Sequence, residues 1–513
     1  MTDRIRISEE NRRWWTLAAM CFALFMVMLD NTVTNVALPS IQRSFDASLS
    51  ALEWTINAYS LSFAVLLVTG GRLGDIFGRR KVFLIGVVVF GVSSATIGLA
   101  PSEGFLVASR AVQGLGAALM MPATLSIITN AFPPSERGKA IGTWAGVSAI
   151  ALALGPLVGG WLTEDVTWRA IFFINVPVAA VAIVVTLFAT HESRDETASK
   201  QVDYAGIAAL SIGLTALVLA LVEGNGWGWG SPRILALFAV ALVGLVGFIV
   251  IETRVKAPIV DFDFFRSRSF VGANLVAFAI SFGMFAVFFF LALYMQNILG
   301  FSPLETGVRF LPSTLVIMVA GPVAGRLADR IGPRTPLVIG LLFVTASLAW
   351  QSRIQTDTSF GFLVVPFILL GVGMGFTMSP MSTAAMNAVD RTKAGVASGT
   401  LSMTRMVGGT FGVAALGALV AAVGRHDLAK TLPNVPQDTR EKLVDALGSG
   451  AAGNVPAQVK QATAQAFVDA LGTGLTIAAA ATALAALAAW LLVDPARPTH
   501  EPAPAPATEA AMV

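Results

Sequence analysis

Two residues of opposite charge lie inside long apolar segments of this 513-residue sequence. Asp30 is the only acidic residue that falls clearly within such a segment, and Arg110 falls within another. Placing an ionisable group in hydrocarbon costs about 2.5–3.5 kcal/mol, so these groups usually serve a function. A carboxyl group that gives up its arginine when it takes a proton would couple proton movement to a conformational change. The alternative is a static ion pair that holds two helices together.

The depths of the two residues agree with such a pairing. Asp30 lies eight residues before the end of its apolar segment, which is about 12 Å along a helix. Arg110 lies about five residues, or about 8 Å, inside its own segment from the same side. We therefore predict that Asp30 and Arg110 form a proton-coupling pair.

Polar side chains near this pair predict either a wet cavity or contacts between helices. Amides and hydroxyls are costly against lipid, so they face water or another helix. The polar candidates for lining a substrate cavity are Asn31, Thr34, Asn35, Asn57, Tyr59 and Gln113.

Three soft side chains and one cation complete the candidate cavity. Phe285, Tyr294 and Met295 are adaptable enough for a pocket that accepts varied apolar compounds. The alternative is that they face lipid or fill the helix bundle. Arg405 lies about eleven residues inside a later apolar segment and has no evident acidic partner. It could meet an anionic part of a substrate, a helix C-terminus, or Asp30 across the cavity.

The elements that position these residues must be membrane-spanning helices. Hydrophobic residues make up 55% of the chain and charged residues 13%, against about 25% charged in an ordinary soluble protein. Together with a mean hydropathy of +0.74, this composition excludes a water-soluble enzyme. Fourteen apolar segments are long enough to cross a bilayer as helices. They lie at residues 14–38, 53–71, 82–100, 105–128, 138–162, 169–190, 204–223, 233–252, 271–299, 306–325, 335–351, 361–384, 395–424 and 470–493.

The positive charges predict how these helices are oriented. With the N-terminus in the cytoplasm, 22 of the 34 lysines and arginines fall in the expected cytoplasmic segments. This bias follows the positive-inside rule and places both termini in the cytoplasm. Because the charges form short clusters between apolar segments, they do not indicate a nucleic-acid partner. One cysteine and three histidines leave neither a disulfide scaffold nor an expected metal site.

One loop sequence occurs twice, 254 residues apart. Gly71–Arg80 follows the second apolar segment, and Gly325–Arg334 follows the second of the last six. Six residues recur in register, although the second copy has Ala328 and Pro333 where the first has glycine and arginine. Repeated halves predict alternating access around a site at their interface.

The first copy of this loop is expected to gate the conformational change. Its glycines let two helix ends approach, and Asp75 can face a helix N-terminus across the interface. The gating residues predicted here are Gly71, Arg72, Gly74, Asp75, Gly78, Arg79 and Arg80.

Small residues in the fifth apolar segment predict a hinge. Gly155, Gly159 and Gly160 stand beside Pro156, and together they allow close helix contact and a kink. We include these four residues among the gating candidates, although close packing alone would require the same residues.

The sequence lacks the motifs of an energy-consuming or catalytic protein. It has no phosphate-binding loop of the form Gly-x-x-x-x-Gly-Lys-Ser/Thr, which argues against direct use of ATP. No catalytic constellation is present, so we predict a non-enzyme without a cofactor that draws its energy from a proton gradient.

Several of these segments resemble the motifs of one family. Gly71–Arg80 resembles the signature loop of the major facilitator superfamily. Leu29–Ile41, Arg110–Ala118 and Gly155–Gly160 are similar to motifs of its fourteen-span drug:proton antiporter branch, the EmrB/QacA-like multidrug exporters. The resemblance implies an all-α integral membrane protein with two six-helix halves and two extra central helices. It also implies residence in the bacterial cytoplasmic membrane.

The function expected from the residues and the resemblance is proton-coupled efflux. The cargo would be apolar, cationic or zwitterionic drugs and dyes, exported by alternating access. The partners would be these small molecules, protons and the lipid bilayer, with the protein as a monomer. One alternative is an exporter or flippase of a native lipid or cell-envelope metabolite. A weaker one is a membrane sensor or channel that does not transport.

The predicted organisation of the chain follows the apolar segments. It comprises a cytoplasmic N-terminus (1–13), a first six-helix half (14–190), a linker with two extra helices (191–270), a second half (271–493) with a long outer loop at about 425–469, and a disordered cytoplasmic tail (494–513).

Overall fold

The protein is a bundle of long helices. The computed structural model describes residues 9–45, 49–194, 196, 203–255, 258, 260, 262–432, 435–436 and 457–495. A helix occupies each of the fourteen predicted segments. In hydrocarbon the backbone N–H and C=O groups find no water, so a helix, which bonds them internally, is the stable form of an apolar segment.

The helices fall into three groups along the chain. The first half contains α1 (Glu9–Phe45), α2 (Leu49–Phe77), α3 (Arg79–Gly98), α4 (Glu103–Ala131), α5 (Pro134–Trp161), α6 (Ala170–Phe173) and α7 (Asn175–Ala189). The central pair is α8 (Tyr204–Trp227) and α9 (Pro232–Glu252). The second half contains α10 (Arg268–Leu293), α11 (Pro303–Ile331), α12 (Arg334–Gln351), α13 (Phe360–Asn387), α14 (Ala394–Thr431) and α16 (Ala457–Leu492). The short elements are η1 (Leu162–Val166), η2 (Phe262–Arg266), η3 (Tyr294–Ile298) and η4 (Arg391–Lys393).

Membrane-spanning character is clear for most of these helices. Eleven of those in the described ranges are long and apolar enough to cross a bilayer. The all-helical, multi-pass architecture is therefore established, while the count of fourteen spans stays a prediction.

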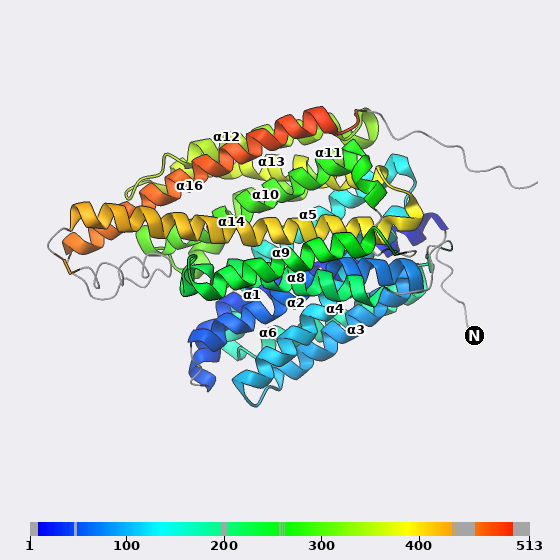
Figure 1. The fold of residues 1–513 in the computed structure, drawn as a ribbon, viewed down its shortest axis with the longest axis horizontal. Coiled ribbons are helices and arrows are strands. Elements are labelled where there is room, and N and C mark those ends of the chain that lie inside the picture. Colours follow the sequence, from blue (N-terminus) through cyan, green and yellow to red (C-terminus); the bar gives the residue numbers. More distant parts are fainter. Residues whose placement is uncertain are drawn as a thin grey trace, which may run out of the picture.

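The two halves contact each other through corresponding helices. Within the first half, α1 packs on α5 and α7, and α4 packs on α2 and α3; within the second, α13 packs on α11 and α12 (Figure 1). Between the halves, the most extensive contact joins α5 to α11, and the next joins α2 to α14. The second helix of each half thus packs against the fifth helix of the other, as expected for repeated halves.

Two glycine turns mark one end of the bundle, which we call the motif end. Gly78 separates α2 from α3 with φ 107°, and Gly332 separates α11 from α12 with φ 87°. These positions correspond in the two copies of the repeated loop. Side chains with a Cβ atom are strained at positive φ, so the turn geometry that the two copies share requires glycine at both places.

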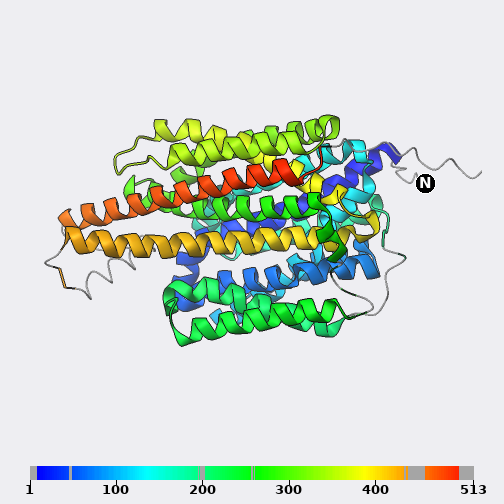
Figure 2. The same ribbon diagram turned by 45° about the horizontal axis from the view of Figure 1, so that its top comes forward.

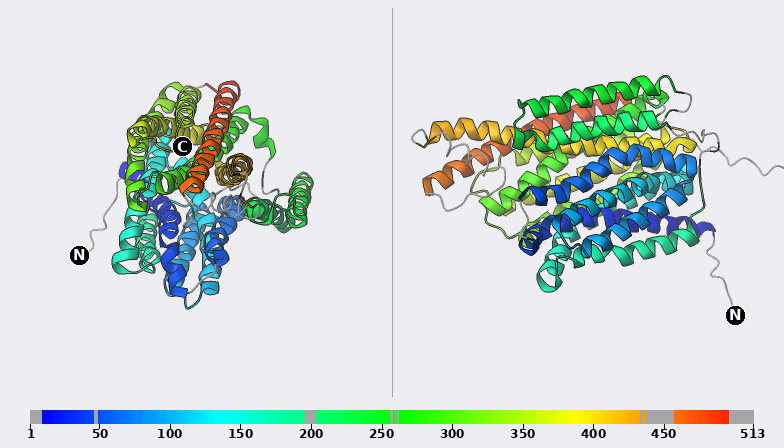
Figure 3. Two further views of the ribbon diagram at one scale, coloured as in Figure 1. Left: turned by 90° about the vertical axis from the view of Figure 1, so that its left-hand side faces the viewer. Right: turned by 60° about the horizontal axis from the view of Figure 1, so that its bottom comes forward.

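The central pair of helices stands at the side of the bundle (Figure 3). α8 contacts α2 and α14, whereas α9 packs on α8. Glycines permit this close packing, since a Cβ atom on Gly244 would lie 2.7 Å from the Cα atom of Gly213. Exposed apolar side chains on α9, such as Leu242 and Val243, present a surface suited to lipid.

The outer loop predicted at 425–469 is shorter in the structure, because helices occupy both of its ends. α14 continues to Thr431 and α16 starts at Ala457, so both helices extend beyond the others at the end opposite the motif end (Figure 2). Apolar length measures the part of a helix in lipid, whereas helix propensity and packing let the helix continue into water. Leu428, for example, is fully buried near the end of α14. Residues 1–8, 437–456 and 496–513 lie outside the described part of the chain, including most of the predicted tail.

The boundaries of two other predicted segments also differ. α1 begins before the predicted span and ends after it. The sixth segment is divided into α6 and α7 at Ile174. Pro177 cannot donate to the carbonyl of Phe173, four residues earlier, so the helix is interrupted just before it.

Candidate functional site

A buried polar network surrounds Asp30 in the first half of the bundle. The Asp30 carboxylate accepts hydrogen bonds from Arg110 Nη1 at 2.5 Å, Gln113 Nε2 at 3.0 Å and Asn175 Nδ2 at 2.9 Å. Both amides also donate to Ser94 Oγ, at 2.7 and 3.1 Å. All five side chains are at most 1% exposed. Residues of α1, α3, α4 and α7 therefore converge on one carboxylate.

Arg110 is held by groups other than the carboxylate as well. Its Nε donates to the carbonyl oxygen of Thr55 at 3.1 Å, and its Nη1 to Gln113 Oε1 at 2.6 Å. The guanidinium carbon lies 4.3 Å from the ring centroid of Tyr59 and 5.9 Å from that of Phe172. Aromatic faces attract a cation, most strongly where water is excluded. Each charge of the pair is thus compensated inside the protein.

Both oxygens of the Asp30 carboxylate thus accept hydrogen bonds although the group is buried. A buried charge is tolerated only when it is paired and its remaining hydrogen bonds are satisfied. Removing one partner of such a pair costs about 3–5 kcal/mol. Asp30 and Arg110 are therefore held together as a satisfied pair in this arrangement of the helices.

At the motif end, Asp75 connects the two halves. Its carboxylate accepts from the backbone N–H groups of Gly395 at 3.0 Å and Val396 at 2.8 Å, in the first turn of α14. Arg79 donates to Asp75 Oδ1 at 2.9 and 2.7 Å and to the carbonyl oxygen of Thr392 at 2.6 Å. A carboxylate at a helix N-terminus satisfies free N–H groups and interacts favourably with the helix dipole. The structure thus places Asp75 against a helix N-terminus of the other half.

Asp329 of α11 occupies the corresponding position in the second copy of the loop. It accepts from the backbone N–H groups of Gly138 at 2.9 Å and Lys139 at 3.1 Å, near the start of α5. Pro333 stands where the first copy has Arg79, so no arginine follows at that position. The second copy therefore keeps the contact between carboxylate and helix and loses the arginine that accompanies it.

Glycines make both of these contacts possible. A Cβ atom on Gly71 would lie 2.3 Å from the carbonyl oxygen of Gly395, and one on Gly325 would lie 1.9 Å from that of Gly138. Both distances are far shorter than any ordinary contact. The halves can therefore meet this closely only through glycine backbones.

The other residues of the first loop act within their own half. Arg80 Nη2 donates to the carbonyl oxygen of Leu187 at 2.8 Å, and the Arg80 backbone N–H donates to Glu192 Oε1 at 3.0 Å. Gly74 is buried beside Arg79, and Arg72 is half-buried. These contacts fix the turn between α2 and α3 against α7.

Two of the glycines of α5 pack against the helix that carries Asp30. A Cβ atom on Gly155 would lie 1.8 Å from Thr32 Oγ1, and one on Gly159 would lie 3.1 Å from Val33 Cα. Gly160 differs from the prediction, since a Cβ atom there would meet nothing within 4 Å. One residue along a helix is a rotation of about 100°, which takes Gly160 off the shared face. The contact of α5 thus reaches within three residues of Asp30.

Gly155→Ala is expected to lower transport several-fold, because the new methyl group pushes α5 away from α1 beside Asp30. Overpacking of this kind costs about 1–3 kcal/mol. Gly160→Ala is the matched control, with the same change in helix propensity and no clash, and should transport normally. The comparison is made on initial rates of substrate uptake into inverted vesicles at equal protein content. Equal rates for the two variants would contradict the hinge role of this contact.

The polar cavity candidates of α1 and α2 lie in different surroundings. Asn31 Nδ2 donates to the carbonyl oxygen of Val27 at 3.0 Å, and Thr34 Oγ1 to that of Asp30 at 2.7 Å. Asn57 is half-buried. The side chains of two further cavity candidates, Asn35 and Phe285, and of the gating candidate Pro156 lie outside the described part of the structure.

Four other cavity candidates are accounted for by packing. Gln113 and Tyr59 belong to the network around Asp30 and Arg110, fully buried in the first half. Tyr294 and Met295 are 0% exposed in the π-helical turn η3, and the Tyr294 hydroxyl donates to the carbonyl oxygen of Gln355 at 2.5 Å. Both side chains are buried in this arrangement of the helices, and their place in a substrate cavity stays a prediction.

Sequence reasoning missed two members of the network. Asn175 and Ser94 each bond the groups around Asp30, yet neither was selected. Asn175 carries a detectable signal, because an amide in the middle of a strongly apolar segment is costly unless it is bonded. Ser94 carries none, since serine is common within helices of this kind.

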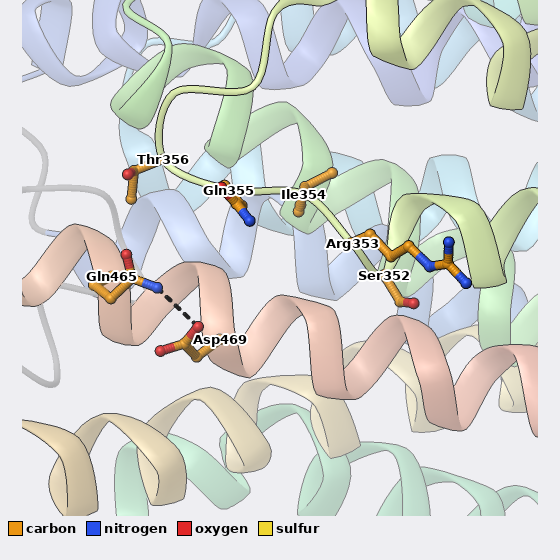
Figure 4. A pocket seen from close by; sticks show the side chains of 7 residues that line it. All are labelled: Ser352, Arg353, Ile354, Gln355, Thr356, Gln465 and Asp469. Atoms are coloured by element: carbon orange, nitrogen blue, oxygen red, sulfur yellow. Dashed lines mark hydrogen bonds between the residues drawn. The ribbon is translucent and has the colours of Figure 1, made fainter.

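A polar recess lies far from this network, at the end of the second half opposite the motif end (Figure 4). Its walls come from the segment after α12 and from α16, where Gln465 Nε2 donates to Asp469 Oδ1 at 2.9 Å. The lining residues are Ser352, Arg353, Ile354, Gln355, Thr356, Gln465 and Asp469. Among the residues that the structure describes, no group of three acidic, histidine or cysteine side chains could hold a metal ion.

Two repeated halves, in which the second helix of each packs against the fifth helix of the other, are the architecture of a multi-pass membrane transporter. The chain belongs to the Major Facilitator Superfamily, whose model matches residues 20–413. It is 39% identical to the tetracenomycin C resistance and export protein of Streptomyces glaucescens, over 87% of this chain and 85% of that protein. It is 36% identical to the multidrug resistance protein Stp of Mycobacterium tuberculosis, over 79% of this chain and 76% of that protein.

Solved structures show the same fold. The proton:xylose symporter XylE matches with a TM-score of 0.64 at 14% identity, covering 95% of this chain and 97% of that one. The human organic anion transporter MFSD10 matches with a TM-score of 0.62 at 14% identity, covering 92% and 99%. Membership in the superfamily thus rests on both sequence and fold.

Proposed function

We propose that this protein is a proton-coupled antiporter that exports drugs or antibiotics by alternating access. The observation that carries the proposal is a fully buried carboxylate within an apolar segment of the first half, Asp30, paired with Arg110 and two amides. Relatives named for resistance to or export of tetracenomycin C and several drugs support the efflux part of the proposal.

In the proposed cycle the motif end faces the cytoplasm. Asp75 and Asp329 close that end by binding the helix N-termini of the opposite half. Proton uptake at Asp30 neutralises its charge and weakens its bonds to Arg110, which then pairs elsewhere. The network loosens, α5 moves on α1, and the helices of the first half tilt against those of the second. Release of the proton restores the pair and resets the transporter.

The finer features of the cycle belong to the same proposal. We propose fourteen spans, both termini in the cytoplasm, and a monomer as the functional unit, working in the bacterial cytoplasmic membrane. No cofactor takes part, since the proton gradient supplies the energy. Moving one charge through 100 mV yields about 2.3 kcal/mol, which supports more than tenfold accumulation of cargo.

The test is substrate-dependent proton movement in liposomes that contain only this protein. A pH-sensitive dye inside the liposomes reports protons, and ethidium serves as the exported probe. Adding ethidium should dissipate an imposed pH gradient in protein-containing liposomes and leave it intact in protein-free ones. Ethidium transport that proceeds equally without a pH gradient would contradict proton coupling, and absence of transport of any drug would contradict efflux.

A further inference from the structure

Arg405 lies on the face of α14 that points into the interface between the halves. Gly395 and Gly399 of α14 contact α2, with Cβ positions 2.5 and 2.9 Å from carbonyl oxygens of that helix. Gly408 and Gly412 contact α10, with Cβ positions 2.6 and 2.0 Å from its carbonyl oxygens. At 100° per residue, Arg405 falls on the arc between these two contact faces. Its side chain therefore projects between α2 of the first half and α10 of the second.

The guanidinium of Arg405 has no counter-charge in the described structure. The residue is half-buried, yet its Nε is buried and makes no hydrogen bond to any residue that the structure describes. Ser398 Oγ, two turns earlier on the same face, is buried and unbonded in the same way. A buried polar group without a partner costs about 1–3 kcal/mol, and more when it is charged. A charged group left in this state is a site for a partner that comes from outside the chain.

Neither Asp30 nor the water at the motif end is available to Arg405. Asp30 already accepts from Arg110, Gln113 and Asn175 in the first half. Arg405 lies eleven residues from the start of α14, about 16 Å, which is farther than an arginine side chain can reach to a membrane surface. Neither the proton-coupling residue nor water at the motif end can therefore neutralise this cation.

Polar groups of α2 lie at the same depth in the bundle as Arg405. From the Gly71–Gly395 contact, Arg405 is ten residues along α14 and Ser60 is eleven residues back along α2, about 15 and 16 Å. Ser60 and Asn57 lie on the same side of α2 as Gly71, since they recur at helical spacing, and both are half-buried. A cation, a hydroxyl and an amide thus lie at one depth near the interface between the halves.

We infer that Arg405 is a binding site for an anionic group, such as a carboxylate or phenolate, on the exported compound. The planar guanidinium binds a carboxylate through two parallel hydrogen bonds, and this geometry gives specificity as well as energy. The inference rests on the proposed export function, because it names the chemistry of the cargo. It adds compounds that carry an anionic group, including zwitterions, to the cargo expected above.

Binding of three probes with one aromatic body tests the inference. The probes are pyrenebutyrate, the neutral pyrenebutanol and the cationic pyrenebutyl-trimethylammonium, titrated against the full-length protein in nanodiscs with tryptophan quenching as readout. The wild type should bind the carboxylate about tenfold or more tightly than the alcohol, as a charged hydrogen-bonded pair contributes. Arg405→Gln should abolish that preference and should not weaken binding of the cation. Arg405→Lys should retain part of it.

The control variant is Arg266→Gln, which removes an equal charge from a side chain that is 85% exposed and should leave all three affinities unchanged. A wild type that binds the carboxylate no better than the alcohol overturns the inference, as does a preference that survives in Arg405→Gln. An equal loss of affinity for all three probes in Arg405→Gln also overturns the inference, since that pattern indicates that Arg405 has a structural role. Because binding is measured without a gradient, failure of proton coupling in the liposome experiment would leave this result standing.

Discussion

Asp30→Asn is expected to reduce proton-driven export to the level of protein-free liposomes, a loss of at least about tenfold. Asparagine cannot carry a proton between the two sides of the membrane, and it leaves Arg110 buried without a counter-charge. Breaking a buried pair in this way costs about 3–5 kcal/mol, so the thermal midpoint of unfolding should also fall by several degrees. The measurements are ethidium-dependent proton flux and the thermal unfolding of the purified protein.

A double variant separates the loss of coupling from the loss of stability. Asp30→Asn combined with Arg110→Met removes both charges, and replacing a buried pair by neutral groups is often neutral or stabilising. We expect its unfolding midpoint to recover while its proton-driven export stays absent. Asp263→Asn, at a side chain 68% exposed, is the control for a lost carboxylate. Normal export by the stable double variant would show that the pair only holds helices together.

Gly325→Val is expected to shift the protein toward a state that is open at the motif end. Its Cβ atom would lie 1.9 Å from the carbonyl oxygen of Gly138, so α5 and α11 must separate. Overpacking costs about 1–3 kcal/mol, which corresponds to a shift of about 5- to 150-fold in the ratio of the two states. The shift is measured as a longer distance between spin labels placed at the motif ends of α5 and α11.

The matched control for this variant is Gly247→Val on α9, which makes the same change in a helix where a Cβ atom would meet nothing within 4 Å. Its label distances should equal those of the wild type. If Gly325→Val also left the distances unchanged, the contact between α5 and α11 would not be part of the gate.

The two carboxylates at the motif end have similar helix contacts and different arginine neighbours, so the proposed gate differs between the halves. Asp75 and Asp329 both bind backbone N–H groups of the opposite half, and the repeat explains why they do so in the same way. Asp75 is bonded by an arginine of its own loop, Arg79, whereas Pro333 replaces that residue in the second copy and Arg137 of α5 lies near Asp329 instead. The contact between carboxylate and helix N–H groups is thus the element that both copies share.

The candidate site was predictable in its principal residues and not in its full extent. Asp30 and Arg110 are detectable because a charge in an apolar segment is costly wherever the segment folds. Gln113 and Tyr59 were selected for the cavity, but their side chains turn to Arg110 instead. That choice depends on which way each helix face points, and helix rotation is set by packing against neighbours.

The sequence by itself determined the class of fold, the helix positions, the repeated halves and the charged pair. These follow from apolar length, from the cost of a buried charge and from a repeat in register, all of which are local or periodic. Only the tertiary structure decided that Asn175 and Ser94 join Asp30, that Asp329 binds the start of α5, and that Arg405 Nε has no hydrogen-bond partner among the described residues. Such contacts join residues up to 191 positions apart, and they depend on side-chain directions that no single segment specifies.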